Sequence, residues 1–103
     1  MNEYRSIPRN IRMHQICIAV YVRTGQGKSC TVSNIANILH LRVSQHLREI
    51  VWDAVEQGLL RASEHQYYGG KVSKRFTYTT DPDNFSLSQS QRIVSQLLKG
   101  GKS

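Results

Sequence analysis

The spacing of the apolar residues changes at Gly58. In segment 44–57, which precedes it, apolar residues recur at the helical period on one face: Leu47, Ile50, Val51, Ala54 and Val55. Segment 62–79, which follows, is rich in aromatic and β-branched residues around a Gly69–Gly70 pair, and it predicts two strands joined by a turn. A chain of 103 residues has room for one core, so we expect a single α+β domain that is mainly helical.

Two further helices are predicted ahead of segment 44–57, for which Ser44 is the expected N-cap. The first begins near Pro8, with Ser6 placed to cap it, and glycines end it after Val22. The β-branched run 16–22 leaves a strand as an alternative within this stretch, because short apolar runs fit either structure. The second helix is short, and Ser33 is placed to cap it.

Positive charge is the strongest feature of the composition. Lys and Arg number 14 against 7 Asp and Glu, which gives a net charge of +7. An anionic partner relieves the self-repulsion of a basic domain, so the charge alone favours DNA, RNA or an acidic membrane surface, with plain solubility as the alternative. No apolar run is long enough to span a membrane and the first residues lack a secretion signal. We therefore expect a cytoplasmic or nucleoid-associated protein without a membrane partner.

Motifs for catalysis or metal binding are not evident in the sequence. Cys17 and Cys30 form no CxxC pair and the histidines are scattered, so we predict no zinc and two reduced, buried thiols. Gly27-Lys28-Ser29 matches the end of a phosphate-binding P-loop, but Val22 stands where the first glycine of that motif belongs. We expect no enzyme activity and no small-molecule cofactor. The stretch is interpreted as a connection in which residues 30–32 could add a short strand beside the hairpin.

The order helix, short helix, turn, longer helix, hairpin and helix resembles the winged helix-turn-helix family of DNA-binding domains, over about residues 8–80. Ile35-Ala36 with Ile38-Leu39 is similar to the second helix of that family, and segment 55–60, VEQGLL, is similar to its exit into the wing. The sequence departs from the family at His40, where the turn often has glycine. The resemblance implies a three-helix core, a β-hairpin wing and an additional C-terminal helix. It also implies sequence-specific binding of double-stranded DNA by a small transcriptional regulator.

In this family the recognition helix, here segment 44–57, enters the major groove of DNA. Polar residues near its N-terminus, off the apolar stripe, are the candidates to contact bases or phosphates: Ser44, Gln45, His46, Arg48 and Glu49. Arg48 suits guanine and Gln45 suits adenine, since each can make paired hydrogen bonds to that base. Trp52 lies at the edge of the apolar stripe, and we expect it to be buried against the wing or the first helix.

The wing, segment 62–79, is expected to contact the DNA backbone or the minor groove, where cations supply affinity that does not depend on sequence. Its candidate contact residues are Lys71, Lys74 and Arg75. Weaker backbone contacts are expected from Lys28, Ser33, Arg42 and Tyr67.

A last helix is predicted over about residues 86–99, and we expect the tail that follows, 100–103, to be disordered. Its apolar stripe is formed by Ile93, Val94, Leu97 and Leu98. Such a stripe suits a homodimer on a palindromic site, and packing onto the first helix is the alternative. Two other functions stay open at this point: a winged helix that assembles with proteins without touching DNA, and one that binds RNA.

Overall fold

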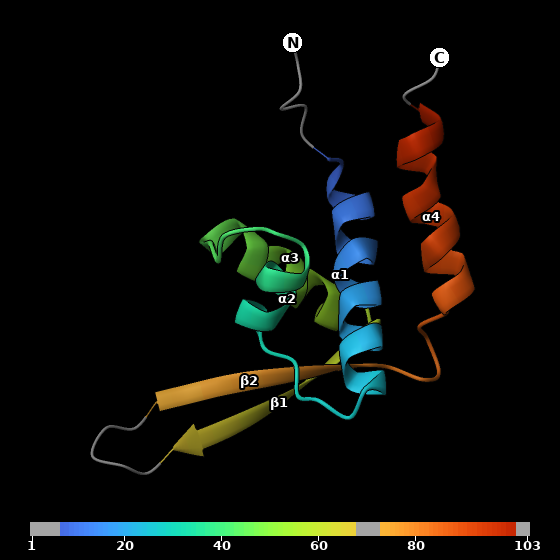
Figure 1. Cartoon of the computed structure of the whole chain (residues 1–103). Coiled ribbons are helices and arrows are strands. Elements are labelled where there is room, and N and C mark those ends of the chain that lie inside the picture. The colour runs from blue at the N-terminus through green and yellow to red at the C-terminus, as the bar shows by residue number, and fades with distance from the viewer. Residues whose placement is uncertain (1–6, 68–72, 101–103) are drawn as a thin grey trace.

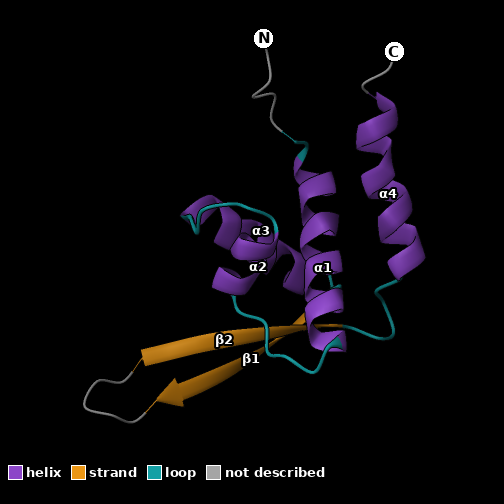
Figure 2. Cartoon of the chain, viewed as in Figure 1, coloured by secondary structure: helices purple, strands orange, loops and turns teal. Residues whose placement is uncertain are grey.

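The computed structural model describes residues 7–67 and 73–100, and within them the side chains of residues 7–64 and 75–96. The chain forms α1 (Arg9–Gly25), α2 (Val32–Ile38), α3 (Gln45–Glu56), β1 (Leu60–Tyr67), β2 (Ser73–Thr80) and α4 (Leu87–Gly100). The described residues thus make a small α+β fold that is mainly helical (Figure 2). None of their helices has the length and apolar character needed to cross a membrane.

Helix α1 stands at the centre of the molecule. In Figure 1, α4 lies along one side of α1, α2 and α3 lie on the other, and the hairpin crosses beneath its C-terminal end. The run 16–22 lies inside α1, so the strand alternative is wrong there. The strand that would precede a P-loop is therefore a helix. Helix packing explains the apolar run, because Ile16, Cys17 and Val20 are fully buried in the core.

Thr31, and not the expected Ser33, caps α2. The Thr31 hydroxyl accepts a hydrogen bond from the Asn34 backbone N–H at 3.3 Å, and the Asn34 side-chain oxygen accepts one from the Thr31 N–H at 2.9 Å. This reciprocal pair satisfies two backbone groups. Ser33 lies two residues too late to cap α2, and it is exposed on the helix itself.

Helices α2 and α3 end in the same way. After α2, the Leu41 N–H donates to the Ala36 carbonyl at 2.8 Å around His40, whose φ is 57°. After α3, the Leu59 N–H donates to the Ala54 carbonyl at 2.9 Å around Gly58, whose φ is 84°. Both are Schellman motifs, which need a left-handed residue. Gly58 is thus confirmed as the stop of α3, and His40 takes the same conformation without being glycine.

The two strands pair antiparallel, from Leu60 opposite Thr80 to Tyr67 opposite Ser73. Instead of the short strand expected at residues 30–32, one hydrogen bond joins this region to the hairpin. The Tyr78 N–H donates to the Cys30 carbonyl at 2.8 Å, and α2 already begins at Val32. This bond fixes the α1–α2 connection against β2.

The core lies where α1, α2, α3 and the hairpin meet. Ile35, Val51 and Leu60 are among its most buried side chains. Both cysteines are free thiols within it, as expected. Burial raises the pKa of Cys17 to about 12, and it raises that of Cys30 to about 11 despite the opposing charge of Arg23. Neither thiol is therefore ionised at neutral pH.

Helix α4 packs along α1, which is the alternative expected for its apolar stripe. Ile93 and Val94 are half-buried, and the side chains of Leu97 and Leu98 lie outside the described ones. Ser86 caps the helix, since its hydroxyl accepts from the Gln89 N–H at 3.3 Å. The helix reaches Gly100, one residue into the tail expected to be disordered, and residues 101–103 are not described.

Candidate functional site

An open groove of about 1040 Å³ separates α3 from the second strand of the hairpin. We call it the α3–β2 groove. One wall is the exposed face of α3, the other is β2, and the start of α2 with the preceding connection closes one end. The lining residues used below are Arg23, Gln45, Arg48, Glu49, Trp52, Arg75, Phe76 and Tyr78. Their sequence positions extend from 23 to 78, so only the folded chain brings them together.

The α3 wall follows from helix periodicity. Gln45, Arg48 and Trp52 are three or four residues apart, so they share one face of the helix. The opposite face is anchored in the core by Leu47, Ile50, Val51 and Ala54. Ser44 fixes where the helix starts, because its hydroxyl accepts from the Leu47 N–H at 3.1 Å. Ser44 is therefore confirmed as the N-cap.

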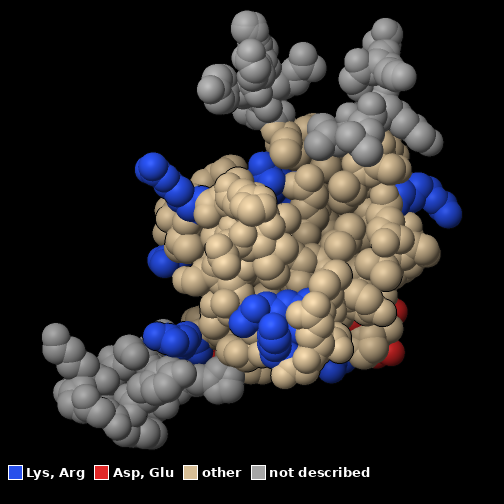
Figure 3. Space-filling model, viewed as in Figure 1, with Lys and Arg blue, Asp and Glu red and all other residues tan. Residues whose placement is uncertain are grey.

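Three arginines from separate elements line the groove, against one carboxylate, Glu49. Arg23 lies in the last turn of α1 and donates to the Ser29 carbonyl, Arg48 belongs to α3, and Arg75 belongs to β2. Burial raises the pKa of Tyr78, and the positive charge of Arg48 opposes that shift, which indicates that the guanidinium lies close to the phenol. Figure 3 shows basic side chains over the α1–α2 connection and the hairpin, and acidic ones beside the β2–α4 connection.

The predicted recognition residues divide between two surfaces. Gln45, Arg48 and Glu49 line the groove. Ser44, His46 and Arg42 line a separate hollow of about 150 Å³ at the N-terminal end of α3. We expected the polar residues at the start of α3 to form one contact surface. In the structure they line two separate hollows.

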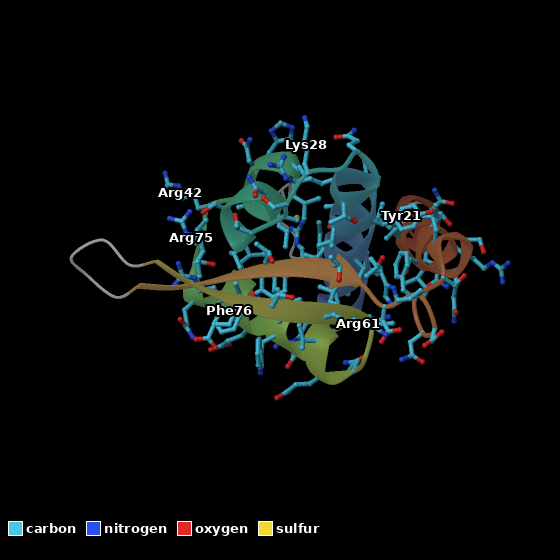
Figure 4. The ribbon with its side chains drawn as sticks, turned by 90° about the horizontal axis from the view of Figure 1, so that it is seen from below. Tyr21, Lys28, Arg42, Arg61, Arg75 and Phe76 are labelled. Atoms are coloured by element: carbon cyan, nitrogen blue, oxygen red, sulfur yellow. The ribbon has the colours of Figure 1, made fainter. Side chains whose placement is uncertain are left out.

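The remaining predicted contacts are placed as follows. Arg75 and Ser33 line the groove. Lys28 is exposed in the α1–α2 connection. Figure 4 shows Arg42 and Arg75 together on the side of the molecule away from Tyr21, with Lys28 between them and Tyr21. Lys71 lies outside the described residues, as do the side chains of Lys74 and Tyr67.

Trp52 is the groove residue whose burial was predicted wrongly. Its ring meets Phe76 of the hairpin edge to face, with ring centroids 5.9 Å apart and planes at 68°. The contact with the hairpin was expected, but burial was not achieved, since Trp52 remains 42% exposed. The spacing from Arg48, four residues earlier, was the signal that could have placed it among the polar candidates.

The comparisons with known proteins assign no chemistry to the groove. The chain matches no protein-family model and no curated protein sequence. Among the described residues, no group of His, Cys, Asp or Glu is placed to hold a metal ion. The chemistry that the groove does offer is cationic, amide and aromatic.

Proposed function

We propose that this chain is a winged-helix protein that binds double-stranded DNA, with α3 in the major groove and the hairpin as a wing on the backbone. A small transcriptional regulator is the role that fits such an activity. The supporting observation is the convergence of Arg23, Arg48 and Arg75, from three separate elements, on one groove beside the exposed face of α3. A net charge of +7 agrees with a polyanionic partner.

The groove residues divide into two chemical roles. Gln45 and Arg48 stand one turn apart on α3, and both carry paired donor or acceptor groups that match base edges in the major groove. Arg23 and Arg75 lie on the elements that flank α3, where a sugar–phosphate strand would run. Base edges thus supply the sequence preference, and phosphates supply most of the affinity.

Two acidic side chains that lie outside the groove form ion pairs. Asp53, on α3, forms an ion pair with Arg9 of α1. Asp81 pairs with Arg61 at the far end of the hairpin from Arg75, with nitrogen and oxygen 3.4 Å apart. Both carboxylates therefore oppose an approaching phosphate less than unpaired ones would.

Selection of bound sequences from random duplex DNA, followed by titrations of the selected and random duplexes, tests this proposal. Arg48→Ala should weaken binding of the selected site by about 1 to 3 kcal/mol and weaken random DNA less. Arg75→Ala should weaken both DNAs alike and reduce the salt slope by about one. Arg92→Ala removes the same charge from an exposed position on α4, so it serves as the matched control.

Two results would contradict the proposal. If no duplex binds at about 50 mM salt, where phosphate contacts are strongest, the protein-assembly alternative is favoured instead. If duplex RNA binds more tightly than duplex DNA, the RNA-binding alternative is favoured. Equal losses for Arg48→Ala on selected and random DNA would remove the base-reading role from Arg48 while leaving the phosphate role.

A further inference from the structure

Trp52 is a large aromatic side chain left 42% exposed in a groove that three arginines also line. Indole usually buries most of its surface, since leaving apolar area in water costs free energy. An exposed indole on a structured helix is therefore suited to a contact that covers it. The neighbouring groups indicate what kind of contact that is.

The Trp52 ring is held in place before any ligand arrives. Its edge-to-face partner, Phe76, is half-buried and packs against the core. The helix that carries Trp52 is fixed by Val51 and Ala54, neither of which is exposed to solvent. A ligand that covers the ring would lose little free energy in ordering it.

The groups around Trp52 match the parts of a nucleotide. Arg48 precedes it by one helical turn and Arg75 adjoins Phe76 on β2, so cations flank the aromatic pair. The amides of Gln45 and Asn34 line the same groove and can donate to or accept from the edge of a base. Aromatic rings combined with cations in a groove are typical of sites that bind unpaired nucleic acid.

We propose that Trp52 stacks on an unpaired base, so that the α3–β2 groove prefers DNA in which a single-stranded segment adjoins the duplex. In an intact duplex the faces of the bases are covered by their neighbours, and only their edges are displayed in the grooves. An indole face gains most from a base face, and an unpaired base in a single-stranded extension leaves both of its faces free for such a contact. This inference rests on the proposed function, because the duplex part is held by the same α3 and hairpin.

The test compares a blunt duplex, the same duplex with a short single-stranded extension, and the single strand alone. Anisotropy of a label on the DNA measures binding. The emission of Trp52, the one tryptophan of the 103-residue chain, measures stacking directly. We expect the extended duplex to bind most tightly and to quench this emission, whereas the blunt duplex binds with little quenching.

Trp52→Leu should weaken binding of the extended duplex roughly fivefold or more and leave the blunt duplex nearly unchanged. Trp52→Phe keeps an aromatic face and should retain most of the preference for the extension. Tyr21→Leu is the matched control: Tyr21 is 43% exposed and also contacts a phenylalanine, Phe85, but on the α4 side of the molecule. It should change neither binding nor quenching.

The outcomes separate this inference from the proposed function. If both duplexes bind but quench Trp52 equally, or if Trp52→Leu keeps the preference for the extension, stacking is wrong and duplex binding stands. If none of the DNAs binds at about 50 mM salt, both proposals are overturned. Urea unfolding of each variant shows whether a loss of binding reflects a loss of folding. Where the Leu variant does not fold, the difference in Trp52 quenching between the two duplexes, measured on the native chain, decides the question.

Discussion

Nδ1 of His14, on α1, lies 2.8 Å from the hydroxyl oxygen of Ser90, on α4. Ser90 is almost completely buried, at 1% exposure. The pair is a side-chain hydrogen bond across the interface that places α4 against the core. A second contact lies about two turns further along α1, where the rings of Tyr21 and Phe85 have centroids 5.6 Å apart. The position of α4 therefore depends on polar as well as apolar contacts.

Ser90→Ala should lower the free energy of unfolding by about 1 kcal/mol, because it removes the hydroxyl partner of His14 at a buried position. Ser88→Ala is the control on the exposed side of α4 and should stay within about 0.5 kcal/mol of the native chain. Urea unfolding followed by circular dichroism measures both. Equal stabilities for the two variants would mean that the His14–Ser90 contact contributes nothing to docking α4.

Stability should fall in mild acid through His14. Burial lowers the pKa of His14 below its ordinary value of 6.5, so the unfolded chain takes up a proton more readily than the folded one. The neutral His14 ring therefore contributes fully to the free energy of unfolding above about pH 6.5. This contribution is lost as the pH falls through the pKa that His14 has in the folded chain. The drop in stability between about pH 7.5 and about pH 5.5 should be smaller in His14→Asn, which cannot titrate. An unchanged drop would show that His14 is not its source.

Thr31→Ala should cost about 1 kcal/mol of stability, since it removes the hydroxyl that caps α2 and its reciprocal bond with Asn34. Ser33→Ala, two residues away, should change stability by less than about 0.5 kcal/mol because Ser33 is exposed on the helix. The pair is compared by urea unfolding. A larger loss of stability for Ser33→Ala than for Thr31→Ala would mean that Ser33 caps α2.

Gly58→Ala should destabilise the chain by about 1 to 2 kcal/mol, because a φ of 84° is strained for residues with a Cβ. The added Cβ would also lie 3.2 Å from the side-chain nitrogen of Asn84. Gly25→Ala is the control at the end of α1, where a Cβ meets nothing within 4 Å. Thermal unfolding should show Gly25→Ala unchanged or more stable by up to about 1 kcal/mol.

His40→Gly should stabilise the chain by about 0.5 to 1 kcal/mol. His40 is exposed and has a φ of 57°, so its side chain adds backbone strain without a described packing contact. The gain is reduced by the greater freedom of glycine in the unfolded chain. Thermal unfolding measures the change, and a lower melting temperature for His40→Gly would show that the imidazole contributes a stabilising contact at the turn.

Much of the fold was predictable because its signals are local. The period of Leu47, Ile50, Val51 and Ala54 identifies α3, and its two ends follow from Ser44 and Gly58, whose roles are confirmed. Such signals act between residues three or four apart. The hairpin was predicted for the same reason, since aromatic and β-branched residues mark the two segments that pair as β1 and β2.

Where a local pattern fitted two structures equally well, tertiary contacts determined which one formed. The run 16–22 suits a strand or a helix, and burial of Ile16 and Val20 between the other helices makes it a helix. Thr31 and Ser33 are both good caps, and the start of α2 is set by the Cys30–Tyr78 hydrogen bond just before it.

The α3–β2 groove itself exists only in the tertiary structure. The sequence by itself determined that α3 carries a polar face and that the chain carries excess positive charge. Whether Arg23, Arg48 and Arg75 meet, and whether Trp52 is covered, depends on how α1, α3 and β2 cross. Those crossings minimise exposed apolar area over the whole core at once, and no segment of the sequence contains that information alone.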